Sequence, residues 1–418
     1  MNLIKTSFLS TIATVVTMAT GLFINKAVAI YIGPAGLALI GQFQNFVQLL
    51  MTFARGAINV GVTKYVAEYG DGSDRIGNLL STASKISFFC SFFVGLGTIV
   101  FSNFLSLYLL KDTRFTYIFV IFGFTIILFV FNNLFLSILN GLKEIKIFIG
   151  INIFQSLYSL VFTTFLIVFF GLDGALIAMV TNQSIVFFVV LWMLRKHPFF
   201  IWKNFISHFD NDEALKLIKY SALTILSAIL YPSFFLYVRE LIITKQGVDE
   251  AGMWQGVCFI SAAYSGVFFR VLSIYYLPKL SETNLQQALI QELYRGLRLV
   301  IPFMLFIFMI IYFSRDYIIN ILFSEDFFKM RDFFIFYLVG DFFKIVAFLF
   351  TTIIVAKAKI LIGIMSEVVF YFFHALSVYF FMLKFGTIGV TYAYAITYFI
   401  FLLFGIYIFK KVASENEI

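Results

Sequence analysis

Five basic residues stand inside segments that are otherwise apolar. Arg and Lys can bind an anion there, and Arg can hold a phosphate through two parallel hydrogen bonds. A cation at the centre of a bilayer costs about 2.5 to 3.5 kcal/mol, so these side chains should face water, a partner or one another. We expect the first four to bind substrate in a cavity, with the alternative that each reaches a lipid headgroup. The five are Lys26, Arg55, Arg239, Arg270 and Lys344.

A stripe of polar residues surrounds the first of these arginines. Its members recur every three or four residues, which predicts one face of a helix over residues 36–62. Amides and hydroxyls at such a face suit a ligand that is rich in hydroxyl groups, such as a sugar. A polar seam between packed helices is the alternative. The stripe consists of Gln42, Asn45, Gln48, Thr52, Arg55 and Asn59.

Acidic residues are rarer in the apolar segments. Asp341 and Lys344 are three residues apart, so they most simply neutralise one another on one helix face. Glu367 and His374 are seven apart, again on one face, and either could load a proton. A satisfied structural pair is equally open, and all four residues are candidates for ion coupling. The sequence has no nucleotide-binding or metal-ligand spacing, so we expect no catalytic residue, metal or cofactor.

The composition predicts an all-α polytopic membrane protein. Of the 418 residues 61% are hydrophobic and 12% are charged, against about 25% charged in soluble domains. Runs of about 20 apolar residues are long enough to span a bilayer. The connections are too short for a soluble catalytic domain, so no enzyme is expected. The predicted spans are 6–32, 36–62, 79–102, 116–140, 147–170, 174–195, 215–244, 251–273, 293–314, 332–356, 360–383 and 387–409.

Twelve spans place both termini on one side of the membrane. Most of the 30 Lys and Arg residues lie in the termini and in the connections on that side of the membrane. Because cytoplasmic segments are rich in Lys and Arg, this distribution predicts that the termini are cytoplasmic.

The sequence also matches itself at an offset of 215 residues. Arg55 falls on Arg270 at this offset, and the turn 171–174 falls on 386–389. Six spans in each repeat is an even number, so the two lobes should be related by an axis along the membrane normal. We expect an N-terminal lobe at 1–195, an amphipathic cytoplasmic linker at 196–214 and a C-terminal lobe at 215–418.

Several motifs resemble those of the Wzx-type polysaccharide repeat-unit flippases, in the branch that holds the O-antigen and lipid III flippases. The resemblance covers nearly the whole chain. It implies a fold similar to that of MATE transporters and the lipid II flippase, in which spans one, two, seven and eight line a central cavity. The motifs are Gly33–Leu37, Gly61–Tyr69, Trp254–Gly256, Tyr276–Ser281, Met330–Asp332 and Val339–Lys344.

The resemblance implies that the chain moves undecaprenyl-pyrophosphate-linked oligosaccharide from the cytoplasmic to the periplasmic leaflet of the bacterial inner membrane by alternating access. Membrane lipids are further partners, the polymerase and chain-length regulator of the same pathway are candidates, and nucleic acid is not expected. The excess of Phe, Ile, Tyr and Lys is typical of an AT-rich gene, which favours an O-antigen unit over the common-antigen unit.

Two rival functions share parts of this pattern. A MATE-like ion-coupled antiporter has the same fold, but cationic drugs favour an acidic cavity, and the lining spans carry four cations against one acid. A polymerase or glycosyltransferase of the same pathway would be expected to have a sizeable loop outside the membrane.

Overall fold

The computed structural model describes residues 3–70, 74–195, 197, 200, 205–282, 286–357 and 359–414. Nearly all of these residues are helical, and none of them lies in a strand. Contacts divide the chain into two compact units. Unit 1 comprises Met1–Ile32 and Leu39–Ser233, and unit 2 comprises Gly33–Ala38 and Phe234–Ile418.

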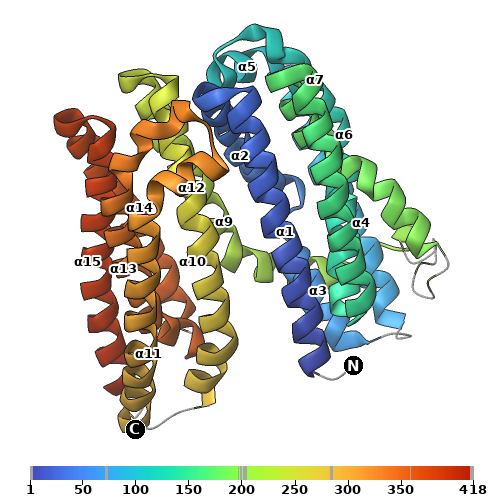
Figure 1. The fold of residues 1–418 in the computed structure, drawn as a ribbon. Helices are drawn as coiled ribbons and strands as arrows, with labels where there is room; N and C mark the ends of the chain where they lie inside the picture. The colour runs from blue at the N-terminus through green and yellow to red at the C-terminus, as the bar shows by residue number, and fades with distance from the viewer. Residues whose placement is uncertain are drawn as a thin grey trace. The chain divides into compact units, whose positions relative to one another are not determined.

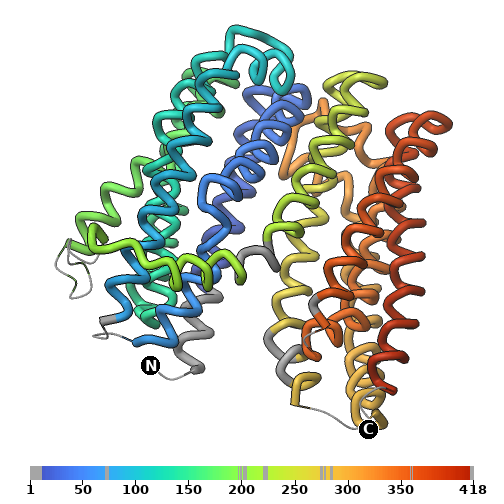
Figure 2. Tube along the Cα trace, turned by 180° about the vertical axis from the view of Figure 1, so that it is seen from behind, coloured from blue at the N-terminus to red at the C-terminus, as the bar shows by residue number. Residues whose placement is uncertain are grey.

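The helices of unit 1 run alongside one another in both views of the chain (Figures 1 and 2). Helix α6 packs against α4 and α7, and α1 packs against α7. The helices are α1 (Leu3–Tyr31), α2 (Gly33–Ala54), α3 (Asn59–Tyr69), α4 (Asp74–Val100), α5 (Ser102–Leu110), the short 3₁₀ helix η1 (Thr113–Phe115), α6 (Thr116–Gly141) and α7 (Ile145–Leu194).

Unit 2 is organised around α13, which packs against α10, α11, α14 and α15. The division between the units falls within α9. The elements are α9 (Asn211–Gln246), α10 (Val248–Glu282), α11 (Gln286–Phe313), α12 (Arg315–Leu322), the 3₁₀ segment η2 (Glu325–Phe333), α13 (Phe334–Ala356), α14 (Ile360–Phe385) and α15 (Thr387–Ser414).

The predicted linker at 196–214 is described only in part, because 196, 198–199 and 201–204 lie outside the described residues. Its last turn is held against α4. The Ser207 carbonyl oxygen accepts hydrogen bonds from Ser81 and Lys85 at 2.7 Å each, and the Asp210 backbone N–H donates to Thr82.

The prediction of a polytopic all-α membrane protein is confirmed. Within the described part of the chain, eleven helices are long and apolar enough to cross a membrane. One of them, α7, has 50 residues and a non-helical backbone at Gly171. A bilayer core about 30 Å thick needs only about 20 helical residues, so α7 contains two spans, and the total is the predicted twelve.

The turn at Gly171 has a counterpart in unit 2 at the repeat offset. Gly171 has φ 56° and ψ −129°, and Gly386 has φ 64° and ψ −150°, a region that favours glycine. Three residues after each turn, a glycine packs tightly on a carbonyl of the preceding helix. A Cβ on Gly174 would lie 2.0 Å from the Leu166 oxygen, and one on Gly389 would lie 2.2 Å from the Phe381 oxygen. Leu166 and Phe381 are also 215 residues apart, so the repeat extends to backbone geometry.

One predicted span is interrupted. The expected helix over 36–62 ends at Ala54 and resumes at Asn59 as α3. Gly56 and Ala57 between them have φ of 59° and 53°, and the Ala57 N–H donates to the Thr52 carbonyl at 3.1 Å. Such a bond, with a residue in the left-handed region, ends a helix. The prediction of one continuous helix was therefore wrong at residues 55–58.

Candidate functional site

Of the four predicted ion-coupling residues, Asp341 and Lys344 come together on α13, around the carboxylate of Asp341. Its side chain is completely buried. Oδ2 accepts hydrogen bonds from Ser261, at 2.6 Å, and from Tyr264, both on α10. Oδ1 accepts hydrogen bonds from Tyr394 on α15, at 2.7 Å, and from Ser265 on α10, at 3.4 Å. Hydroxyl groups from two neighbouring helices thus satisfy a buried anion that would otherwise be very costly.

Lys344 supplies the opposite charge. Its Nζ lies 3.5 Å from Asp341 Oδ1, one helical turn away, and donates to the Tyr394 hydroxyl at 3.2 Å. Nζ also lies 5.5 Å from the ring centre of Phe269 and 5.7 Å from that of Tyr398, within the range of cation–π attraction. Asp341 and Lys344 therefore form an ion pair inside an aromatic and hydroxyl shell, whereas a role in ion coupling stays a prediction.

His374 on α14 lies at the edge of the same shell. It is 3% exposed, and its ring centre lies 4.4 Å from that of Phe234 and 5.9 Å from that of Tyr394. Its Nδ1 has no hydrogen-bonding partner among the described residues. Glu367, two helical turns before it on α14, is only partly buried. The histidine thus adjoins the Asp341 shell through Tyr394.

Arg239 is enclosed where α9 and α10 pack. It is completely buried. Its Nη2 donates to the Gln255 side-chain oxygen, and its guanidinium carbon lies 5.6 Å from the ring centre of Trp254. Both contacts lie on the first half of α10. This enclosure favours a structural role over the predicted contact with a ligand.

Arg55 has a different environment, at the break between α2 and α3. It is partly buried, and its Nε donates to the Met51 carbonyl at 3.0 Å. This is the only hydrogen bond or ion pair of its side chain within the described part of the chain. Its two Nη groups are therefore free to donate to a ligand, as two parallel donors would to a phosphate.

The predicted polar stripe is divided by the same break. Gln42 and Thr52 are buried on α2, Asn45 is partly buried and Gln48 is exposed. The Thr52 hydroxyl donates to the Gln48 carbonyl at 3.1 Å, within the helix. Asn59 is the first residue of α3, so it does not continue the face of α2. The amides of α2 remain candidates for contact with a sugar.

The other two predicted cations differ in exposure. Lys26 on α1 is partly buried, and Arg270 on α10 is exposed. Each of them takes part in interactions within the molecule. In the described ranges, no group of three or more His, Cys, Asp or Glu side chains could hold a metal ion.

Sequence reasoning missed the hydroxyl ligands of Asp341. Ser261, Tyr264 and Ser265 follow one another at spacings of three and one on α10, and this polar face was a usable signal. Tyr394 had none, because tyrosine is common in this chain and a contact across 53 residues cannot be read from spacing.

Comparison with known proteins gives full-length matches. The chain is 27% identical over 410 residues to the lipid III flippases of Escherichia coli (strain K12) and Shigella flexneri, and the match covers 96% of this chain and of each relative. No protein-family model matches the sequence.

Solved structures match the fold over nearly the whole chain. A structure of the lipid II flippase MurJ, in an inward closed conformation, superposes with a TM-score of 0.73 at 17% identity, over 99% of this chain and 90% of that one. An inward-facing MATE family multidrug resistance transporter gives a TM-score of 0.70 at 15% identity, over 97% and 95%. The resemblance to the Wzx-type flippases is therefore confirmed over nearly the whole sequence, on the fold shared by MATE transporters and the lipid II flippase.

Proposed function

We propose that the chain is a flippase for undecaprenyl-pyrophosphate-linked oligosaccharide in the bacterial inner membrane, and a transporter rather than an enzyme. The observation that carries the proposal is the full-length similarity to lipid III flippases. The fold supports it, because the lipid II flippase MurJ and MATE transporters share it over most of the chain.

Arg55 is the residue best suited to the pyrophosphate. Its side chain is partly buried, which strengthens its electrostatic interactions, and its Nη groups have no partner in the described part of unit 1. A pyrophosphate concentrates negative charge on oxygens that a guanidinium can bind in pairs. Asn45 and Gln48, about three and two helical turns before it, would contact the first sugars, whereas Gln42 is buried.

Two glycans are candidates for the transported unit. The curated relatives are lipid III flippases. Lipid III carries the enterobacterial common-antigen unit, so this similarity favours that unit. The composition of the chain, with 59 Phe and 22 Tyr, is typical of an AT-rich gene and favours the O-antigen unit. The comparison carries more weight, because it covers nearly every residue of the chain.

For coupling, we propose that Asp341 and Lys344 neutralise one another and that a proton is loaded on α14, by Glu367 or His374. The pair is saturated by hydroxyl groups, whereas the His374 Nδ1 has no partner among the described residues. Substitution of the residue that loads the proton, by Glu367→Gln or His374→Gln, should change the response of transport to an imposed pH gradient. An unchanged response in either variant would remove that residue from the mechanism.

Deletion and complementation test the function itself. A strain without this chain should accumulate lipid-linked glycan on the cytoplasmic leaflet, and mass spectrometry of that glycan should identify the unit. The wild-type chain should restore the periplasmic form, and cysteine accessibility should place the loop around 143–146 in the cytoplasm. Efflux of cationic drugs without any glycan accumulation would instead favour the MATE-like antiporter.

A further inference from the structure

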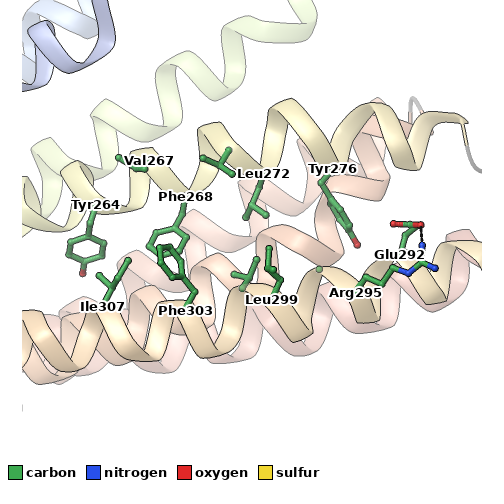
Figure 3. Close-up of a pocket in the computed structure, with 13 residues that line it drawn as sticks. Tyr264, Val267, Phe268, Leu272, Tyr276, Glu292, Arg295, Leu299, Phe303 and Ile307 are labelled. Atoms are coloured by element: carbon green, nitrogen blue, oxygen red, sulfur yellow. Dashed lines mark hydrogen bonds and ion pairs between the residues drawn. The ribbon is translucent and has the colours of Figure 1, made fainter. Parts of the chain in front are cut away.

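An elongated groove runs between α10 and α11 on unit 2 (Figure 3). Its volume is about 850 Å³. From Tyr264 to Tyr276 the groove follows about 18 Å of helix, at 1.5 Å for each residue. Its walls are almost entirely apolar, and Val271, Leu299 and Phe303 are 62%, 76% and 59% exposed. The groove is therefore an open slot with one row of side chains from each helix.

One end of the groove is polar. There Arg295 Nη1 donates to Glu292 at 2.7 Å, while the Arg295 side chain is 72% exposed and that of Glu292 is 9% exposed. The Tyr276 ring points toward this pair (Figure 3), is 1% exposed, and its hydroxyl has no hydrogen-bonding partner among the described residues. Burying a hydroxyl without a partner is unfavourable, and a ligand that accepts its hydrogen bond at this end would relieve that cost.

We propose that this groove holds the isoprenoid tail of a polyprenyl pyrophosphate, with its first phosphate beside Arg295 and Tyr276. The proposal rests on the proposed function, which supplies a substrate with one long apolar chain. This substrate joins a long apolar chain to a phosphate, which matches a groove that is apolar along its length and has Arg295 and Tyr276 at one end. The exposed guanidinium of Arg295 can donate to a phosphate without leaving Glu292.

The preference for this tail over other lipids should be moderate. Lipid tails are as apolar as the groove, so no hydrophobic transfer drives binding within a bilayer. The preference must therefore come from close packing along the slot and from the phosphate contacts, and each of these contributes a small part of the binding free energy. We therefore expect a preference on the order of 10-fold, equivalent to about 1.4 kcal/mol.

Photolabelling of the full chain in lipid nanodiscs tests the groove directly. The probe is a polyprenyl pyrophosphate with a photoreactive group in its tail and no glycan. Wild-type protein should be labelled on α10 and α11 between residues 264 and 307. Leu299→Trp, which fills the slot from an exposed position, should lower this labelling about 10-fold. Leu305→Trp is the matched control, since Leu305 is 50% exposed on α11 and does not line the groove.

Two further probes separate the headgroup contact from the tail. Tyr276→Phe should lower labelling by the pyrophosphate probe about 2- to 10-fold, from the net value of one hydrogen bond, and should not change labelling by the uncharged polyprenol. Equal labelling of the groove by photoreactive phosphatidylglycerol, or equal effects of the two Trp substitutions, would overturn the proposal. Because the probe has no glycan and nothing is transported, a failure here is distinct from a failure of complementation.

Discussion

The two units follow one plan, but they differ at equivalent positions. Arg55 and Arg270 are 215 residues apart, yet the helix breaks after Arg55 and continues through Arg270. Gly56 and Ala57 at the break correspond to Val271 and Leu272 in α10. The conformation of Gly56 is one that a β-branched valine strongly disfavours. A small change in sequence has thus given one unit an arginine at a helix end and the other an uninterrupted helix.

The buried ion pair is a second difference, and here unit 2 has the charged residues that unit 1 lacks. Asp341 and Lys344 in α13 correspond to Ile126 and Phe129 in α6, so unit 1 has an apolar helix where unit 2 has a buried ion pair. Unit 2 thus contains a closed polar network whose donors are directed inward. Unit 1 contains Arg55, whose two Nη groups have no partner among the described residues. The comparison predicts that mutations in the network mainly change stability and that mutations at Arg55 mainly change transport.

The largest effect should come from breaking the buried pair. Asp341→Asn removes the negative charge beside Lys344 and should lower the free energy of unfolding by up to about 3 to 5 kcal/mol, less what the 24% exposure of Lys344 recovers. The double variant with Lys344→Gln should recover much of this loss. Thermal unfolding in detergent measures the effect.

Transport assays on the same variants complete this test. If the double variant is stable but its transport no longer responds to a pH gradient, Asp341 takes part in coupling and the purely structural interpretation is wrong.

Arg55→Ala should have the next largest effect, and on transport alone. Loss of one charge-assisted contact of about 1.5 to 3 kcal/mol should weaken binding of the ligand about 10- to 150-fold. Arg55→Lys should restore only part of this, because the planar fork of donors is lost. Leaflet-specific accumulation of the lipid-linked glycan measures transport, at matched expression.

Arg239→Ala is the contrasting variant. It empties a completely buried position at the packing of α9 on α10, so it should reduce the amount of folded protein. Full complementation by Arg55→Ala, or normal stability with lost transport in Arg239→Ala, would contradict the assignment of these two roles.

A smaller effect is expected from Gly340→Ala. A Cβ at Gly340 would lie 2.2 Å from Tyr394 Cδ1, so the ring must move, and its hydroxyl would leave both Asp341 and Lys344. Overpacking of this kind costs about 1 to 3 kcal/mol. Gly97→Ala is the control, because nothing lies within 4 Å of its Cβ. Equal melting temperatures of the two variants would mean that Tyr394 can shift without loss.

The smallest effect belongs to a partly exposed carboxylate, that of Asp210. A backbone hydrogen bond from Glu213, and another from Asp212, lower the pKa of Asp210 at the start of α9. The carboxylate therefore stabilises the fold at pH values above its unfolded pKa of about 3.9, and this contribution is lost as the pH falls through the lower folded value. Asp210→Asn should remove that pH dependence. Melting temperatures between pH 3 and 6 compare the two, and parallel curves would contradict it.

The sequence predicted what depends on local pattern. Long apolar runs gave the twelve spans, and the three-residue spacing gave the contact of Asp341 with Lys344. The break at 55–58 was missed because alanine at residue 57 favours a helix, so its type gives no sign of a left-handed backbone. The hydroxyls of Tyr264 and Tyr394 reach Asp341 from other helices, and the groove depends on how loosely α10 and α11 pack. Both are tertiary features, which spacing along one chain does not contain.

The turns at Gly171 and Gly386 also constrain how the chain is made. Each connects two spans with almost no residues between them, and Gly174 and Gly389 then pack against the helix that has just ended. The ribosome therefore delivers the second span of each pair directly after the first, with no polar loop to hold the first one in place alone. Each pair should enter the translocon as a single hairpin, so a chain truncated between the two spans should fail to keep the first span stably in the bilayer.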